Sequence, residues 1–119
     1  HLDVAMSTGI DESRVVVVCL THEYFRQVEE AARRGVYSNC LREWTYALAR
    51  NKCLVPVIME PSLRDTSRWP PGIIAMHFAR TMYVDASDCV GTAAARITHE
   101  VRAKTIRPRR CRGLAYGTL

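Results

Sequence analysis

Two unbroken apolar runs, residues 15–20 and 54–59, constrain the fold of this chain more than any other feature. The first contains four consecutive valines and shows no alternation with polar residues. Such runs are typical of strands in a parallel sheet that is covered on both faces. The segment between them carries helical periodicity, as expected for a crossover between parallel strands. Pro56 within the second run favours a sheet position whose N–H is not needed.

The remaining segments extend this alternation of strands and helices. We expect a third, shorter strand at residues 81–85 and a long polar loop at residues 60–71. Helices are expected at residues 2–13, at about 39–51 and at 90–104, with a short helical turn at 72–78. A further helix is expected to begin after a Thr21 cap and to end at Gly35. The sequence therefore predicts an α/β domain with about three parallel strands and flanking helices.

The positive charge of the chain is concentrated at its end. Six of the 17 basic residues and none of the 12 acidic ones lie after residue 100. Residues 105–119 are therefore interpreted as a basic, loosely ordered tail, for which a solvated linker is favoured over contact with nucleic acid or anionic lipid. No apolar run reaches the roughly 18 residues that a membrane span requires.

The five cysteines are odd in number and lack C-x-x-C spacing or paired histidines. This pattern argues against a zinc site and against a disulfide framework. We expect Cys19 and Cys53 to pack as small hydrophobic residues. The pattern favours a reducing compartment, which we take to be the cytoplasm.

The segment from Ser38 to Ala47 reads as the start of the helix before the second apolar run. Ser38 or Asn39 can cap this helix through a side-chain oxygen. Glu43 is then expected near the positive end of the helix dipole. Two interpretations of Glu43 stay open at this point: a carboxylate that performs chemistry beside a strand end, and a carboxylate that only stabilises the helix.

Five groups of residues, in order, resemble the C-terminal part of a Toll/interleukin-1 receptor (TIR) domain. Gly9-Ile10-x-x-Ser13-Arg14 precedes the valine run, and Cys19-Leu20-Thr21-x-x-Tyr24 follows it. Asn39-Cys40-Leu41-Arg42-Glu43 resembles the family's W-C-x-x-E helix start, with Asn39 where Trp is common. Val55-Pro56-Val57-Ile58 resembles its fourth strand, and Trp69-Pro70 followed by Tyr83-Val84-Asp85 resembles its later loop and fifth strand. The combination looks most like TIR domains of protists and lower eukaryotes.

The resemblance implies a flavodoxin-like parallel sheet, of which residues 1–104 form the C-terminal portion. The family's first strand, first helix, second strand and BB loop have no counterpart, so the expectation is an N-terminally truncated TIR-like domain. Family topology places the absent first strand beside residues 15–20. That strand should then expose an apolar sheet edge, which favours association.

The resemblance also implies a function. TIR domains act in innate-immunity-like signalling through association with other TIR domains, and many of them cleave NAD at the nicotinamide–ribose bond with a glutamate of this helix. The matching residue is Glu43, and NAD would be a substrate, with no cofactor or metal implied. The alternatives are a purely non-catalytic adaptor and, more distantly, nucleic-acid binding through the tail.

Four further residues are candidates for contacting the substrate. Thr21 and His22 follow a strand end, where α/β sheets bind ligands, or else His22 is an exposed loop histidine. Trp69 would stack on nicotinamide, or else cover the sheet end as a loop residue. Cys40, near a helix N-terminus, would carry a reactive thiol with a lowered pKa, or else pack in the core.

Overall fold

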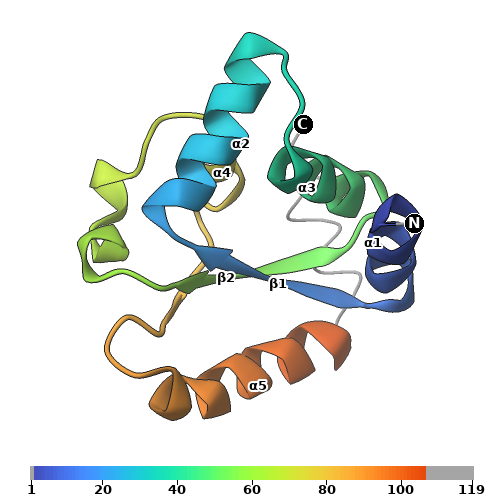
Figure 1. Cartoon of the computed structure of the whole chain (residues 1–119). Coiled ribbons are helices and arrows are strands. Elements are labelled where there is room, and N and C mark those ends of the chain that lie inside the picture. Colours follow the sequence, from blue (N-terminus) through green and yellow to red (C-terminus); the bar gives the residue numbers. More distant parts are fainter. Residues whose placement is uncertain (1, 107–119) are drawn as a thin grey trace.

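The computed structural model describes residues 2–106, with side chains described from residue 4 onward. Its centre is a three-stranded parallel sheet in the order β1-β2-β3, with helices on both faces (Figure 1). The strands are β1 (Val15–Leu20), β2 (Cys53–Ile58) and β3 (Val84–Asp85). The helices are α1 (Leu2–Glu12), α2 (His22–Arg34), α3 (Asn39–Ala49), α4 (Ile73–His77) and α5 (Val90–Ile106). The predicted α/β fold with a three-stranded, flavodoxin-like parallel sheet is confirmed.

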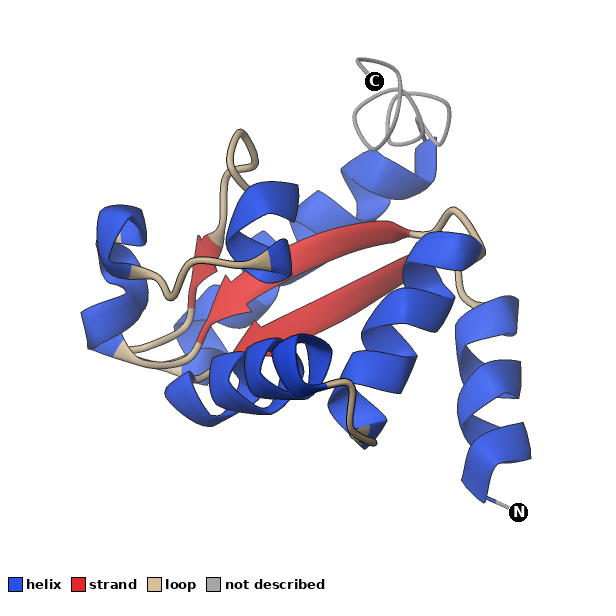
Figure 2. Ribbon diagram, turned by 90° about the horizontal axis from the view of Figure 1, so that it is seen from above, coloured by secondary structure: helices blue, strands red, loops and turns tan. Residues whose placement is uncertain are grey.

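The two faces of the sheet carry two separate hydrophobic clusters. On one face, strand residues such as Leu20 and Ile58 pack with Phe25 of α2 and Trp44 of α3. On the other face, α5 contributes Ala93 to a cluster with residues of β2 and β3. Figures 1 and 2 show α2 and α3 on one side of the strands and α5 on the other. The domain therefore has three layers, with the sheet in the middle.

The first strand is less covered than its sequence predicts. Val18 and Leu20 are buried, but Val17 is 38% exposed and Cys19 is also exposed. The difference arises because β1 is the edge strand of the sheet, as the family topology predicts for residues 15–20. The expectation that Cys19 packs as a small hydrophobic residue is therefore wrong, whereas all six residues of β2 are buried.

Pro56 lies in the central strand, at a position that does not need its missing N–H. The Ile58 carbonyl accepts a hydrogen bond from the Ala86 N–H, so it points toward the β3 side of β2. Peptide groups two residues apart in a strand point the same way, so the Pro56 nitrogen also faces that side. The β3 ladder pairs only with Val57 and Ile58, so no strand lies opposite Pro56 there. The expectation from the sequence is met.

The polar loop predicted at residues 60–71 contains two short 3-10 turns, η1 (Pro61–Arg64) and η2 (Thr66–Arg68). Arg64 holds the first turn against the end of the sheet. Its Nε lies 2.8 Å from Asp85 Oδ2, and its Nη2 lies 2.7 Å from Asp88 Oδ1. Asp85 also accepts a hydrogen bond from the Ser87 N–H at 2.9 Å, as befits a strand-end turn residue.

The predicted boundary at residue 104 falls inside α5, which continues to Ile106. The basic tail that we predict at residues 105–119 lies, from residue 107 on, outside the described residues. Cys53 is buried as predicted, but it is disulfide-bonded, which the sequence did not indicate. Cys19, Cys40 and Cys89 are free thiols.

Helix α4 is capped by a side chain from another element. The Glu29 carboxylate of α2 accepts hydrogen bonds from the Ile73 and Ile74 N–H groups, each at 3.0 Å. The approach is close, because a Cβ on Gly72 would lie 2.3 Å from Glu29 Cδ. Gly72 also has a φ of 156°, which a residue with a side chain rarely adopts. Glycine at this position therefore lets α2 cap α4.

We predict that Gly72→Ala lowers the free energy of unfolding by roughly 1–3 kcal/mol, because the new methyl group displaces the Glu29 carboxylate from two backbone donors. Chemical denaturation measures the change. The matched control is Gly9→Ala in α1, where a Cβ would meet nothing within 4 Å. The control should be neutral or stabilising by up to about 1 kcal/mol. Equal destabilisation by both substitutions would contradict this role of Gly72.

Candidate functional site

The start of α3 is fixed by a serine cap. Ser38 has an extended backbone, and its Oγ accepts a hydrogen bond from the Leu41 N–H at 3.3 Å. The helix begins at Asn39, so Glu43 is in its second turn, and the first turn holds no acidic residue. The helix dipole acts mainly within the first turn. The expectation that Glu43 stabilises the helix through this dipole is therefore wrong. The interpretation of Glu43 as a simple helix-stabilising carboxylate is weakened accordingly.

The neighbour of Glu43 anchors the helix in the core. Trp44 is 2% exposed, and its ring makes edge contacts with His77 and Phe78 at centroid distances of 5.3 and 5.6 Å. Burial also lowers the pKa of His77, which favours its neutral form among the rings. Since Trp44 points into the core, the adjacent Glu43 is turned outward and is exposed.

Glu43 lies where two hollows of the surface meet. A groove of about 590 Å³ separates α1 from α3 and is lined by Val4, Met6, Ser7, Ile10, Arg42, Glu43, Thr45, Tyr46 and Ala49. A smaller hollow of about 250 Å³ runs along the outer edge of β1 and includes Val17, Cys19, Tyr24 and Trp44. Ile10 and Glu43 belong to both. A single exposed carboxylate therefore stands between two largely apolar depressions.

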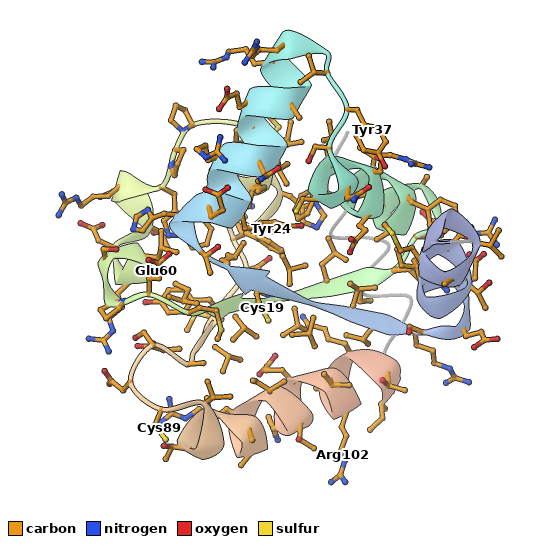
Figure 3. The ribbon with its side chains drawn as sticks, viewed as in Figure 1. Cys19, Tyr24, Tyr37, Glu60, Cys89 and Arg102 are labelled. Atoms are coloured by element: carbon orange, nitrogen blue, oxygen red, sulfur yellow. The ribbon has the colours of Figure 1, made fainter. Side chains whose placement is uncertain are left out.

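Tyr24 is the residue of this site that the sequence did not single out. It lines the smaller hollow, and burial raises its pKa, with further contributions from Cys40 and Glu43. The phenol is therefore neutral at physiological pH. Tyr24 was visible in the sequence only as part of the motif after β1; its position between α2 and α3 (Figure 3) requires the folded chain.

Cys40 does not carry a low-pKa thiol. Burial is the main reason that its pKa is raised, and the nearby Glu43 and Glu23 carboxylates raise it further. Cys40 packs against the hydrophobic cluster around Trp44 and Phe25. Of the two alternatives for Cys40, the structure supports packing, and the reactive thiol is wrong.

Thr21 and His22 lie at the end of β1 but serve local structure. Thr21 caps α2, since its hydroxyl accepts a hydrogen bond from the Tyr24 N–H at 2.9 Å. The His22 ring contacts the Ser62 hydroxyl at 2.5 Å, and its backbone N–H donates to Glu60. Figure 3 shows Glu60 toward the ends of the strands. Neither Thr21 nor His22 lines the two hollows around Glu43.

Trp69 is a core residue. It is 8% exposed, its ring packs on Phe25 at 5.2 Å, and its Nε1 donates to the Leu63 carbonyl at 2.7 Å. The ring and its donor are thus already engaged inside the protein. The expectation that Trp69 stacks on nicotinamide is contradicted by this burial, and the alternative of a tryptophan that covers the sheet end describes it correctly.

Helix α1, which lines one side of the larger groove, is held to α3 by Asp11. Asp11 accepts hydrogen bonds from the Tyr46 hydroxyl at 2.6 Å and from Arg50 Nε at 2.8 Å. Its backbone carbonyl accepts a third from Lys52 Nζ at 3.1 Å. These contacts link residues more than 30 positions apart and hold the larger groove in shape.

Two other features of the described residues bear on function. Between residues 2 and 106, no group of three or more His, Cys, Asp or Glu side chains is placed to hold a metal ion. The helices in the same range are all too short or too polar to cross a lipid bilayer.

The fold and the site define a flavodoxin-like α/β domain with a helix-borne carboxylate beside its edge strand. The sequence matches the TIR domain family over residues 1–99, which extends from α1 into α5. No curated protein and no solved structure matches the chain. The chain belongs to the TIR domain family, and it is therefore a signalling module of the type that acts through TIR–TIR interactions.

We predict that acidification loosens α1 from α3. Hydrogen bonding from Tyr46 and the charge of Arg50 hold the pKa of Asp11 below its usual value of 3.8. The contact is therefore complete above that value, and it is lost as the pH falls through the lower pKa of the folded state. Hydrogen exchange of α1 amides, followed from pH 6 down to pH 2, measures this.

The variant Asp11→Asn should show the faster exchange already at pH 6. Glu12→Gln, an exposed change on the same helix, is the control and should behave like the wild type. An α1 that exchanges equally slowly in Asp11→Asn and in the control would contradict this role of Asp11.

Proposed function

We propose that this TIR domain cleaves NAD at the bond between nicotinamide and ribose, with Glu43 as the catalytic residue, and that this activity accompanies its TIR–TIR association. The observation that carries the proposal is the position of Glu43. It is an exposed carboxylate on an anchored helix, at the junction of two hollows beside the edge of the sheet. The resemblance of residues 39–43 to the family's catalytic helix start supports the same assignment.

One carboxylate suffices for this reaction. Most glycosidases need a second carboxylic acid to protonate the leaving oxygen. In NAD the leaving ring is already cationic, so the bond to C1′ of the ribose breaks with both electrons passing to the ring nitrogen, and neutral nicotinamide departs. Water then adds to C1′ and loses a proton, which gives ADP-ribose.

The role of Glu43 in that sequence is electrostatic. Positive charge moves from the pyridinium ring to the ribose in the oxocarbenium-like transition state, and a fixed anion beside the ribose stabilises it. The carboxylate also accepts hydrogen bonds from ribose hydroxyls and so orients the sugar.

The second candidate function is a non-catalytic adaptor, and the exposed edge strand favours it. An edge strand with apolar side chains is a template for association with another chain. Val17 and Cys19 are exposed on β1, next to the smaller hollow. In this alternative, the surface around Glu43 serves contact with another TIR domain rather than chemistry.

We further propose a cytoplasmic location and a role in innate-immunity-like signalling, as the family resemblance implies. Cys19, Cys40 and Cys89 are free thiols, which fits a reducing compartment, whereas the disulfide-bonded Cys53 points the other way. The location stays a prediction.

We predict that the full-length natural protein, concentrated on a crowding support, releases nicotinamide from NAD, and that Glu43→Gln lowers the rate by roughly 100-fold or more. The substitution keeps the size of the side chain and removes its charge. Chromatography of nicotinamide and ADP-ribose measures the rate.

The control for this experiment is Glu100→Gln on α5, which lies on the opposite face of the sheet. It should leave the rate within about twofold of the wild type. No release from assembled wild-type protein would favour the non-catalytic adaptor, and equal rates in the wild type and Glu43→Gln would remove Glu43 from the mechanism.

A further inference from the structure

Helix α5 presents a basic face to solvent. Its buried residue Ala93 packs against the sheet. The exposed side carries Arg96, His99, Arg102 and Ile106, which are three or four residues apart and therefore lie along one side of the helix. Figure 3 shows Arg102 pointing away from the sheet. Because this basic face of α5 points away from the sheet, an element that adds to the edge of the sheet would leave it open.

The arginines of the basic face have no acidic partner in the part of the chain that the structure describes. Neither Arg96 nor Arg102 forms an ion pair with any residue from 2 to 106. The one acidic residue of α5, Glu100, is half-buried on the side of the sheet. On α2, by contrast, Arg34 pairs with Glu30 at 3.0 Å. The positive charge of α5 is therefore available to an anion outside the domain.

The positive charge continues in the sequence beyond α5. No acidic residue follows Glu100 in the chain. The helix ends at Ile106, and the next six residues include Arg107, Arg109, Arg110 and Arg112. Clusters of roughly four to eight basic residues on or beside a helix are typical of proteins that bind anionic lipids. Residues 107–112 lie outside the described part of the chain, and the surface proposed below consists of α5 residues only.

Ile106 favours a lipid surface over nucleic acid as the partner. It is 77% exposed at the end of the basic face. An apolar side chain among basic ones can enter the boundary between headgroups and acyl chains while the charges pair with phosphates. Single-stranded nucleic acid is bound largely by aromatic side chains that stack on the bases, and α5 contains no Phe, Tyr or Trp.

We propose that the basic face of α5 docks on an anionic phospholipid membrane, with Arg96 and Arg102 contacting headgroup phosphates and Ile106 entering the membrane boundary. The cytoplasmic leaflet is anionic, so this docking fits the cytoplasmic location proposed above. It would concentrate TIR domains on a surface and so favour their association. The docking does not depend on Glu43 or on cleavage of NAD.

The test is co-sedimentation of the full-length natural protein with vesicles of phosphatidylcholine that contain about one third phosphatidylserine. The wild type should bind these vesicles but not vesicles of phosphatidylcholine alone. Binding should weaken as the salt concentration rises, because salt screens charges at an exposed surface. This comparison of lipids tests the proposal without any substitution.

A pair of substitutions tests the basic face itself. Arg96→Gln combined with Arg102→Gln should lower the partition coefficient by roughly 25-fold, since each basic residue near an anionic surface contributes about fivefold. The matched control combines Arg33→Gln with Arg80→Gln, which removes two exposed arginines from elements on the opposite face of the sheet. The control should stay within about threefold of the wild type, because charges far from the membrane are screened.

Ile106→Gln separates lipid from nucleic acid. It should weaken vesicle binding by roughly threefold to tenfold, because a buried apolar contact is lost. Met82→Gln, at a position that is 85% exposed near the other edge of the sheet, is the control and should not weaken it. Binding to an oligonucleotide that is tighter than vesicle binding and unaffected by Ile106→Gln would overturn the lipid assignment in favour of nucleic acid.

Two further results would overturn the proposal. The first is no binding to phosphatidylserine vesicles at low salt. The second is vesicle binding that survives the pair on α5 but is lost when the four arginines at 107, 109, 110 and 112 are replaced by glutamine, because the α5 face would then be unnecessary. All α5 and control positions are exposed, so these variants should fold like the wild type, which circular dichroism checks.

Discussion

The site depends on the burial of Trp44 between α3 and α4. A large ring that makes edge contacts with His77 and Phe78 sets the rotation of α3 about its own axis. Once Trp44 faces inward, Glu43 must face outward, toward α1 and the edge of β1. The cap that Glu29 provides to α4 supports the same arrangement from the far side, since α4 carries His77 and is followed by Phe78. The catalytic position proposed for Glu43 is thus a consequence of core packing.

The strands and helices could be predicted from the sequence because each has a local signal. The valine run, the Thr21 cap and the Gly35 stop define β1 and α2 with almost no tertiary information. Relations between elements were harder to predict. The exposure of Val17 and Cys19 depends on β1 lying at the edge of the sheet, which the family topology predicts but a continuous apolar run does not indicate.

In the candidate site, too, local sequence signals could be interpreted, whereas contacts between elements could not. The family-like pattern of residues 39–43 points to Glu43, whose catalytic role stays a prediction, whereas the place of Trp69, Thr21 and His22 after a strand or in a loop is a weaker signal. Burial of Trp69 and capping by Thr21 are decided by packing and hydrogen bonds that the sequence does not display. Tyr24 and the Asp11 contacts with α3 were missed because they join segments that only the fold brings together.

The most direct test of the account is to map NAD on the protein without turnover. Glu43→Gln protein labelled with ¹⁵N would be titrated with NAD and its amide shifts followed by NMR. Binding at the proposed site predicts shifts along α3 around Glu43 and at Tyr24, with α5 unaffected. Shifts confined to other surfaces, or none at millimolar NAD, would contradict the claim that Glu43 lies in a site for NAD.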